Sequence, residues 1–409
     1  MDGVVEDGSI YDEIGVPPVI NATGTKTRIG GSRIRSEAVD AMVRASDSFV
    51  RISDMQAEAS ARIAEITGAE AGYVTSGASA GLLLGAAATL AGRDVHRMDR
   101  LPETSGIPDE IIMPRTHRTG YDHAFRAAGA TIVDVGTNDR HLGTGATNVE
   151  PWEIEAAISD ETAAIGYVQK SYTEPPLEVV TKIAHRHDVP VIVDAAAELP
   201  PVENFSRFID DGADLVVFSG GKAIRGPQTT GIVAGRRDLI ESIALQQLDM
   251  HAAAAVWDPP SALIDGDRLD AVPRQGIGRP MKVGKEELAG LIVALESFLE
   301  EDQAELAREW QDRAARISTV LSEIDGFETT VTSGNDVSVS PEVVVHIVPS
   351  EAGVSATDLV RALRRENPRV FVGTDRLDEN IVTINPMCLT DEEADYVLDR
   401  IEACVGPSH

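Results

Sequence analysis

The chain has 409 residues, of which 43% are hydrophobic, enough apolar material for the cores of two or three domains. Asp and Glu outnumber Lys and Arg by 67 to 36, and the formal net charge is -31. This charge repels nucleic-acid phosphates and anionic membranes, so neither is an expected partner. The acidic excess, together with the scarcity of lysine, also indicates adaptation to high salt, where a carboxylate-rich surface stays hydrated.

The cysteine content and the termini predict a compartment. Cys388 and Cys404 form neither a disulfide framework nor a metal-ligand spacing, as expected in a reducing environment. The acidic N-terminus lacks an apolar signal core. The longest apolar run, residues 82–91, is too short to span a bilayer. We therefore expect a soluble cytoplasmic protein.

In chain order, the first predicted elements are helices over residues 36–67, with Ser36 as an N-cap and Gly68 as a stop. A short strand at 73–75 then leads through a small-residue turn into a helix at 80–91. Beyond it, strands and helices alternate, which predicts a parallel sheet covered on both faces. The predicted strands are 110–113, 131–135, 163–168, 190–194 and 214–218, and the helices between them are 121–128, 151–158 and 177–187.

The last part of the chain predicts a second, smaller domain. The strand at 231–234 is expected to be an antiparallel edge strand, and one long helix at about 283–318 would leave the large domain. Residues 327–405 again alternate strand and helix, which indicates a small α/β domain that the N-terminal arm would complete. The expected parts are an N-terminal arm and helix contributing to the small domain or a dimer (1–55), a cofactor-binding large domain (56–285), and a linking helix with the C-terminal small domain (286–409).

Lys222 lies in a glycine-rich turn directly after the apolar run 216–218, and it is one of six lysines against thirty arginines. Burial lowers the pKa of an amine and makes it a nucleophile toward carbonyls, as a Schiff base requires. The hydroxyl of Ser219, three residues earlier, could bind a phosphate. A solvated lysine in a turn that merely closes a strand is the alternative. We interpret Lys222 as the residue that holds pyridoxal 5'-phosphate (PLP).

Two further segments suit the same cofactor. The turn Ser76-Gly77-Ala78-Ser79 precedes a helix, so its backbone N–H groups could bind phosphate at the positive helix terminus, although a tight strand-to-helix turn explains it equally well.

Asp194 ends an apolar strand, where a carboxylate can pair with the protonated pyridine nitrogen of PLP and strengthen its electron sink. Ala196, two residues on, is small enough to leave room for the ring. The alternative for Asp194 is a helix cap at a strand end.

An aromatic side chain could complete the site. His117 could stack on the pyridine ring, with His123 as its competitor; an isolated histidine is otherwise a surface or structural residue. No Cys/His set has metal-ligand spacing, so no metal is expected.

Several strings together carry a resemblance to a known family. They are residues 19–25, 75–81, 193–198, 219–228 and 277–287. They resemble the bacterial selenocysteine synthase-like group of fold-type I PLP-dependent enzymes, and within it the D-glucosaminate-6-phosphate ammonia-lyase branch.

The resemblance implies an aspartate aminotransferase-like α/β fold, with a mostly parallel seven-stranded sheet in the large domain and a small C-terminal α/β domain. It also implies Lys222 as the Schiff-base lysine, Asp194 on the pyridine nitrogen, and a homodimer or larger homo-oligomer.

Two departures from the family pattern affect the expected substrate. Gly31 stands where selenocysteine synthases carry an arginine, and with the negative charge it makes tRNA an unexpected substrate. The string Thr383-Ile384-Asn385-Pro386 has no arginine, whereas many fold-type I enzymes bind the substrate carboxylate with the arginine of a comparable Arg-Ile-Ser-Pro-like string. Arginine pairs well with carboxylate or phosphate. The substrate-binding candidates are therefore Arg28, Arg225, Arg274 and Arg279, of which Arg279 is favoured. Gln228, in the lysine turn, is a further candidate.

The resemblance thus implies a PLP-dependent ammonia-lyase or dehydratase. Its substrate would be a hydroxylated amino acid or amino sugar acid, D-glucosaminate or its 6-phosphate, which α,β-elimination converts to a 2-keto acid and ammonia. The residues leave β-replacement, racemisation and aldol cleavage open as other outcomes of the same chemistry. A protein that only binds PLP is a further alternative, which the aspartate, lysine and phosphate turn argue against.

Overall fold

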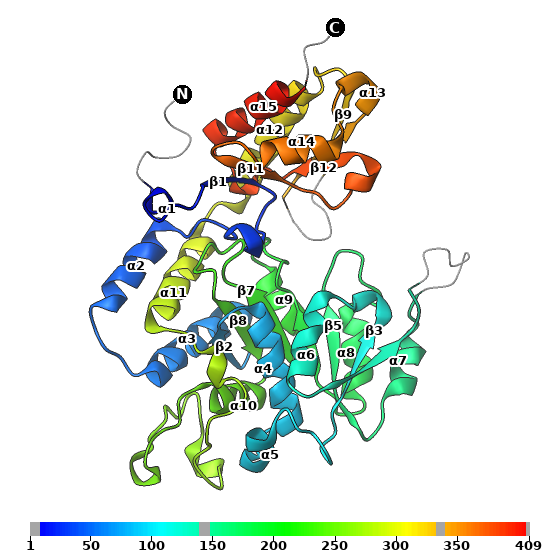
Figure 1. The fold of residues 1–409 in the computed structure, drawn as a ribbon. Coiled ribbons are helices and arrows are strands. Elements are labelled where there is room, and N and C mark those ends of the chain that lie inside the picture. Colours follow the sequence, from blue (N-terminus) through cyan, green and yellow to red (C-terminus); the bar gives the residue numbers. More distant parts are fainter. Residues whose placement is uncertain (1–8, 139–147, 333–339, 406–409) are drawn as a thin grey trace. The chain divides into compact units, whose positions relative to one another are not determined.

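The computed structural model describes residues 9–138, 148–332 and 340–405 (Figure 1). The chain divides into two compact units, a larger one of Ile34–Glu300 and a smaller one of Met1–Arg33 with Glu301–His409. The larger unit includes α2 (Ser36–Ser46) and α11 (Lys285–Glu300), which the sequence had placed in the N-terminal arm and the linking helix.

The larger unit is built on a seven-stranded sheet in the order β2-β8-β7-β6-β5-β3-β4, in which β4, β3, β5, β6 and β7 pair in parallel. This confirms the mostly parallel sheet. The strands are β2 (Ala71–Thr75), β3 (Glu110–Pro114), β4 (Thr131–Val135), β5 (Thr162–Val168), β6 (Val191–Asp194), β7 (Leu215–Ser219) and β8 (Gly231–Gly235).

The expectation that the strand at 231–234 forms an edge was half wrong. β8 is antiparallel to β7, as predicted, but β2 pairs with its other side. Every residue of β8 is buried, and an open edge there would leave its backbone polar groups without partners. β2 therefore forms the edge of the sheet.

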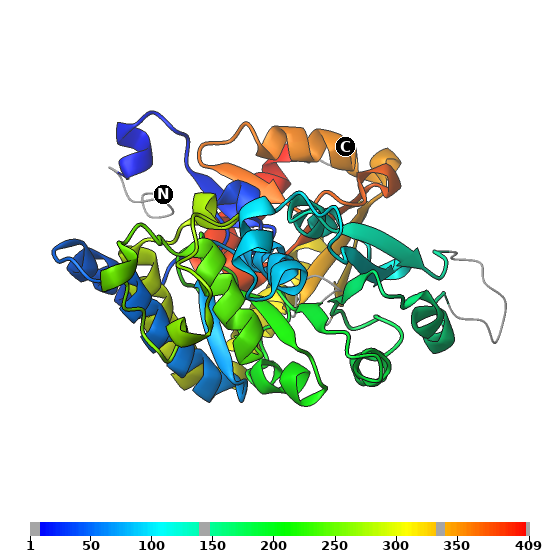
Figure 2. The ribbon, with the colours of Figure 1, turned by 90° about the horizontal axis from the view of Figure 1, so that it is seen from below.

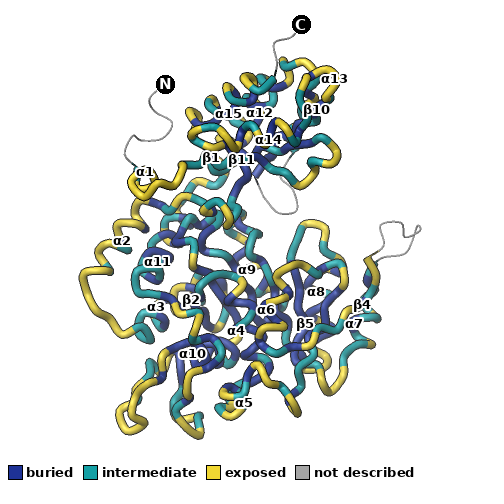
Figure 3. The backbone as a smooth tube through the Cα atoms, in the orientation of Figure 1, coloured by how far each residue is buried: buried dark blue, intermediate teal, exposed yellow. Residues whose placement is uncertain are grey.

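Successive side chains of a strand point to opposite faces of the sheet, and each face has its own hydrophobic core. Leu215 and Val217 of β7 point into one core, whereas Val216 and Phe218 point into the other. Except for the edge strand β4, of which only Val135 is buried, the strands of this sheet are mostly buried along their lengths (Figure 3). The helices of one face are α3 (Ile52–Thr67), α7 (Pro151–Ala157), α8 (Leu177–His185), α9 (Asn204–Asp210) and α11, and those of the other are α4 (Ala78–Ala91), α5 (Val95–Arg100), α6 (His123–Ala127) and α10 (Arg237–Gln247).

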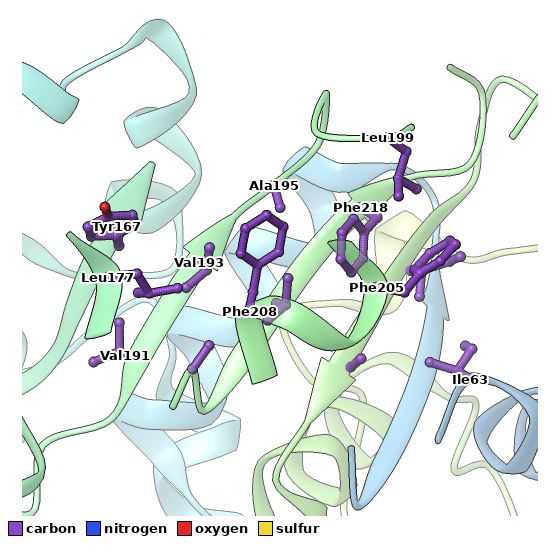
Figure 4. Packing of buried hydrophobic residues seen from close by; sticks show 14 of the residues in the cluster. Ile63, Tyr167, Leu177, Val191, Val193, Ala195, Leu199, Phe205, Phe208 and Phe218 are labelled. Carbon is purple, nitrogen blue, oxygen red and sulfur yellow. The ribbon is translucent and has the colours of Figure 1, made fainter. Parts of the chain in front are cut away.

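Aromatic rings form the centre of the first core. Phe205 and Phe208 of α9 pack against Phe218 of β7, with ring centroids 5.1 and 6.2 Å apart (Figure 4). Such pairs add to the stability that area burial alone provides. They fix the end of β7, directly before the turn that carries Lys222.

The two helices predicted early in the chain are present, with one corrected end. Gly68, at φ 70°, ends α3 as predicted. Ser36 is not the N-cap of α2, because Arg35 occupies that position and the Ser36 hydroxyl bonds the carboxylate of Glu37. α2 and α11 lie side by side (Figures 1 and 2).

The single helix expected at 283–318 is two helices. α11 ends at Glu300, and α12 (Gln303–Leu321) begins after Asp302, whose carboxylate accepts hydrogen bonds from the N–H groups of Ala304 and Glu305 at 3.0 and 2.9 Å. A carboxylate that caps a new helix favours a break over a continuous helix. The helical periodicity continued across the break and concealed it.

The smaller unit contains a three-stranded antiparallel sheet, in the order β12-β10-β9, and a separate parallel pair, β1 with β11. The N-terminal segment thus joins this unit through β1. The strands are β1 (Val19–Ala22), β9 (Phe327–Thr332), β10 (Glu342–Ile347), β11 (Arg369–Val372) and β12 (Ile381–Ile384), and the helices include α12, α14 (Ala356–Leu363) and α15 (Asp391–Cys404). In the described parts of both units, no helix combines the length and apolarity needed to cross a membrane.

Candidate active site

The predicted cofactor-binding residues lie at the edge of the sheet where the parallel strands end. Gly231 of β8 lies between Thr75 and Ser219, the last residues of β2 and β7. Asp194, at the end of β6, lies between Val217 of β7 and Val168 of β5. Ligands of open α/β sheets bind at this carboxyl edge.

The turn that carries Lys222 is tightly folded. Gly220 donates its N–H to the carbonyl of Thr230, and Gly226 donates to the carbonyl of Gly220, both at 2.9 Å. Arg225 donates to the carbonyl of Lys222 at 3.0 Å and adopts φ 58°, a left-handed conformation that is costly for a residue with a side chain. The surrounding contacts thus fix the backbone on both sides of the half-buried Lys222.

Arg35 supports this turn, and sequence reasoning missed it. Its side chain is buried, and its Nε donates to the carbonyl of Ile224 at 2.9 Å, while its backbone N–H donates to the carbonyl of Arg225 at 2.9 Å. An arginine before a helix carries no signal in sequence, because its partners lie some 190 positions later in the chain.

Asp194 is the last residue of β6, as predicted, and it is half-buried. Its Oδ1 accepts the N–H of Ala196 at 3.1 Å, which fixes the orientation of the carboxyl group. Burial raises the pKa of Asp194, whereas the Ala196 N–H and the charges of Lys222 and Lys170 oppose that rise. Lys222 and Asp194 are therefore close enough to interact electrostatically.

A second pair of charges adjoins Asp194 and was not among the predicted site residues. The Nζ of Lys170 lies 3.0 Å from Oε1 of Glu198. Burial raises the pKa of the Glu198 carboxyl, and Lys170 opposes this. The rarity of lysine could have singled out Lys170, and Glu198 lies in the same string as Asp194.

His117 is the histidine that lies at this edge, since His123 is exposed at the start of α6. His117 accepts the N–H of Val168 at its Nδ1, 3.4 Å away, so its Nε2–H can donate to the carbonyl of Glu174 at 3.1 Å. Burial lowers the pKa of His117 to about 4, so the ring is neutral near pH 7. Its ring is edge-on to Tyr167, at a centroid distance of 4.7 Å.

The turn between β2 and α4 suits a phosphate. Gly77 adopts φ 130° at the N-cap of α4, and no side chain caps this helix. A Cβ on Gly231 would lie 2.5 Å from the carbonyl carbon of Gly77 and 2.7 Å from the nitrogen of Ala78, so glycine is required there. Ser76 and Ala78 are half-buried and Ser79 is exposed. The turn, the lysine and the aspartate together fit the phosphate, aldehyde and ring nitrogen of PLP.

The structure separates the proposed substrate-binding residues. Gln228 packs against Gly221, whose added Cβ would lie 2.7 Å from the Cα of Gln228. Together with Arg225, it therefore belongs to the lysine turn.

Arg279 lies 3.4 Å from Asp249, and Arg274 lies 3.9 Å from Asp99 of α5, beyond the end of α4 that is remote from the phosphate turn. α4 has 14 residues and is therefore about 20 Å long, so the structure does not bring Arg274 to the lysine turn of the same chain. Arg28 is exposed on a short helix of the smaller unit, Thr27–Ile29.

Asn385, which stands in the string where fold-type I enzymes often carry arginine, has a structural environment in the smaller unit. It is buried, and its Oδ1 accepts from the Ser340 hydroxyl and from the Met387 N–H, each at 3.0 Å. Its backbone N–H donates to the carbonyl of Ala22 in β1 at 2.9 Å. Asn385 therefore holds the N-terminal strand in this unit.

Comparisons with known proteins agree with this geometry. The chain is 29% identical over 401 residues to the D-glucosaminate-6-phosphate ammonia lyase of Salmonella typhimurium, covering 96% of this chain and 97% of that protein. It is 30% identical over 399 residues to a 5'-C-glycyluridine monooxygenase-decarboxylase of Streptomyces sp, covering 96% and 91%. A solved structure of D-glucosaminate-6-phosphate ammonia-lyase matches with a TM-score of 0.79 and 28% identity, over 98% of this chain and 99% of that one.

These likenesses confirm the expected fold type and cofactor: the chain is a PLP-dependent enzyme with the α/β fold of fold type I. A family model described as SelA, L-seryl-tRNA selenium transferase, matches residues 19–253, more than half of the chain. The chain therefore belongs to the SelA family.

Proposed function

We propose that this enzyme is an ammonia-lyase that acts on a hydroxylated amino acid or amino sugar acid, with D-glucosaminate or its 6-phosphate as the leading substrates. The observation that carries the proposal is the near-full-length likeness, in sequence and in structure, to D-glucosaminate-6-phosphate ammonia-lyase. The turn with Lys222, the carboxylate of Asp194 and the phosphate-binding turn support it, because they meet at one edge of the sheet.

The roles of the residues follow from their positions. Lys222 would bind the cofactor aldehyde, Asp194 the protonated ring nitrogen, and the turn Ser76–Ser79, with Ser219, the phosphate; Ala196 leaves space beside the ring. When bound, PLP supplies an electron sink for the charge that develops at the substrate Cα. His117, which accepts a hydrogen bond from Val168 at the end of β5, is proposed to stack on the pyridine ring.

Lys222 would also transfer the proton of the substrate Cα. Its amine, released when substrate binds, would take the proton from Cα and return it to the departing β-hydroxyl, which leaves as water. Hydrolysis of the remaining imine gives a 2-keto acid and ammonia. Asp194 would present its carboxylate to the protonated ring nitrogen. His117 is not a proton donor near neutral pH, because its pKa is about 4 and it is already neutral.

The substrate carboxylate needs a cation in place of the missing arginine. Arg225 is the cation best supported, because it lies on the lysine turn, and the neutral amide of Gln228 on the same turn could donate a hydrogen bond. Arg279, Arg274 and Arg28 remain predictions. A homodimer or larger assembly, a cytoplasmic location and the absence of nucleic-acid partners also remain predictions.

The proposal is tested by incubating the enzyme at high salt with D-glucosaminate, its 6-phosphate, and D- and L-hydroxy amino acids. We expect 2-keto acid and ammonia in equal amounts from one of them. Lys222→Ala should abolish product, whereas Lys182→Ala, at an exposed position on α8, should not. An active Lys222→Ala protein would overturn the assignment, and racemised, substituted or cleaved products without ammonia would favour the alternative reactions.

A further inference from the structure

A second ion pair lies beside Asp194, and stability alone does not account for it. The side chains of Lys170 and Glu198 are 17% and 16% exposed, and their charged atoms are 3.0 Å apart. An ion pair this enclosed must overcome the cost of removing both charges from water, so burial of the pair adds little net stability. Its position suggests another role.

Backbone hydrogen bonds join the loops that carry Lys170 and Glu198 to the main chain around Asp194. The N–H of Gln169, the residue before Lys170, donates to the carbonyl of Asp194 at 3.0 Å. The N–H of Glu198 donates to the carbonyl of Ala195 at 3.1 Å. Lys170 follows β5 and Glu198 follows β6, so the two neighbouring strands present the pair at the carboxyl edge of the sheet.

Further hydrogen bonds fix the two loops. The N–H of Lys170 donates to the hydroxyl of Thr173 at 2.6 Å, and that hydroxyl donates to the Lys170 carbonyl at 2.7 Å. The side-chain amide of Asn204, which is buried, donates to the carbonyl of Glu198 at 2.6 Å. The backbone on both sides of the pair is therefore held in place.

Four charged or titratable groups surround Asp194. They are Lys222 after β7, Lys170 after β5, Glu198 after β6 and His117 after β3. His117 is neutral, and the Lys222 amine is committed to chemistry and cannot serve as a constant charge. Lys170 is therefore a lysine near Asp194 that takes no part in the proposed chemistry. Burial raises the pKa of Asp194, and the charges of the two lysines oppose that rise.

We propose that Lys170 is a positioning residue that keeps Asp194 ionised to receive the protonated ring nitrogen of PLP, and that the carboxylate of Glu198 offsets part of the Lys170 charge. This rests on the proposed role of Asp194 and goes beyond the residues assigned above. Neither side chain needs to touch the cofactor, because both act through the charge of Asp194.

The test measures the affinity of the cofactor-free full chain for PLP as a function of pH, by absorbance or fluorescence at constant high salt. PLP should bind more tightly when Asp194 is ionised, so affinity falls as pH falls through the pKa of Asp194. Lys170→Met removes a cation that lowers this pKa, so the midpoint should move to higher pH by about one unit. Below both midpoints, that shift weakens binding by about tenfold.

Three matched variants separate this role from a structural one. Lys170→Arg keeps the charge and should retain the wild-type midpoint. Glu198→Gln leaves Lys170 without its compensating anion and should move the midpoint to lower pH. The double variant Lys170→Met with Glu198→Gln keeps the shapes of both side chains without their charges, and its melting temperature shows whether it folds.

The outcomes are distinguishable. Opposite shifts for Lys170→Met and Glu198→Gln, with Lys170→Arg unchanged, support the proposal. Equal midpoints in all variants, even with lowered melting temperatures, overturn it and leave the pair a structural one. If wild type itself binds no PLP at any pH, the proposed function fails as well.

Discussion

At the residue scale, the site depends on groups whose ionisation is set by their surroundings. Asp194 is a carboxyl group with a raised pKa beside two lysines, and His117 is an imidazole with a pKa lowered to about 4. Burial raises the pKa of Asp194 and lowers the pKa of His117. The nearby lysines oppose the rise in the pKa of Asp194. The enzyme thus places a carboxyl group at the end of β6 and a neutral ring after β3, two strands that β5 separates in the sheet.

The His117 ring predicts a pH dependence of stability. Its folded pKa of about 4 lies below the unfolded value of about 6.5, so the unfolded chain binds the extra proton first. Stability is therefore unaffected above about pH 6.5, falls as pH drops through this window, and levels off below about pH 4. The fall attributable to this group is on the order of 1 kcal/mol per pH unit.

We expect His117→Phe to flatten the plot of unfolding free energy against pH between pH 6.5 and 4. Urea unfolding at several pH values measures the slope. The loss of two hydrogen bonds lowers the stability of the variant, but the slope does not depend on that loss. His123→Phe, at an exposed position, is the control and should keep the wild-type slope. Equal slopes for His117→Phe and wild type would contradict the buried, neutral ring.

At the element scale, helix ends are decided by single side chains. Gly68 ends α3 through a left-handed backbone, and Asp302 begins α12 by accepting two backbone N–H groups. The first is visible in sequence because glycine at the end of a periodic stretch is a strong signal. The second was not recognised, because Asp302 lies among other acidic residues within a continuous helical pattern.

The Asp302 cap should make a measurable contribution to the free energy of unfolding. Asp302→Ala is expected to lower the free energy of unfolding by about 1 kcal/mol, because two N–H groups lose their acceptor. Asp302→Asn should recover most of that loss. Glu309→Ala, at an exposed position within α12, should change stability by a few tenths of a kcal/mol only. Thermal or urea unfolding would reject the cap if the Asp302 and Glu309 variants behave alike.

At the scale of the whole molecule, charge is the dominant property. A net charge of -31 opposes the compact state through self-repulsion. Salt reduces this repulsion, because the screening length falls from about 10 Å at 0.1 M to about 3 Å at 1 M. High-salt adaptation stays a prediction, and it concerns the surface of the folded protein, not its active site.

We expect the melting temperature to rise steadily as potassium chloride is increased from about 0.1 to 2 M. A variant with Glu58, Glu309 and Asp399, all exposed, replaced by Lys should show a smaller rise, because less repulsion remains to be screened. This comparison separates charge screening from the general effect of salt on apolar burial. Identical salt dependence in the two proteins, or full stability of wild type in dilute buffer, would count against the prediction.

The sequence by itself determined the local order of the chain and supplied the proposed site residues. Alternating apolar strands and helices required a sheet covered on both faces, and Lys222, Asp194 and the turn at 76–79 were recognisable because each follows a strand. Strand ends are local features, and parallel strands bring them to one edge whatever their separation along the chain.

Only the tertiary structure decided what surrounds those residues. That Arg35 holds the Lys222 turn, that Lys170 and Glu198 pair beside Asp194, that β2 covers β8, and that Arg274 lies remote from the lysine turn all depend on contacts between distant segments. Such contacts carry no periodicity or spacing in sequence, because their geometry is set by the packing of whole elements against each other.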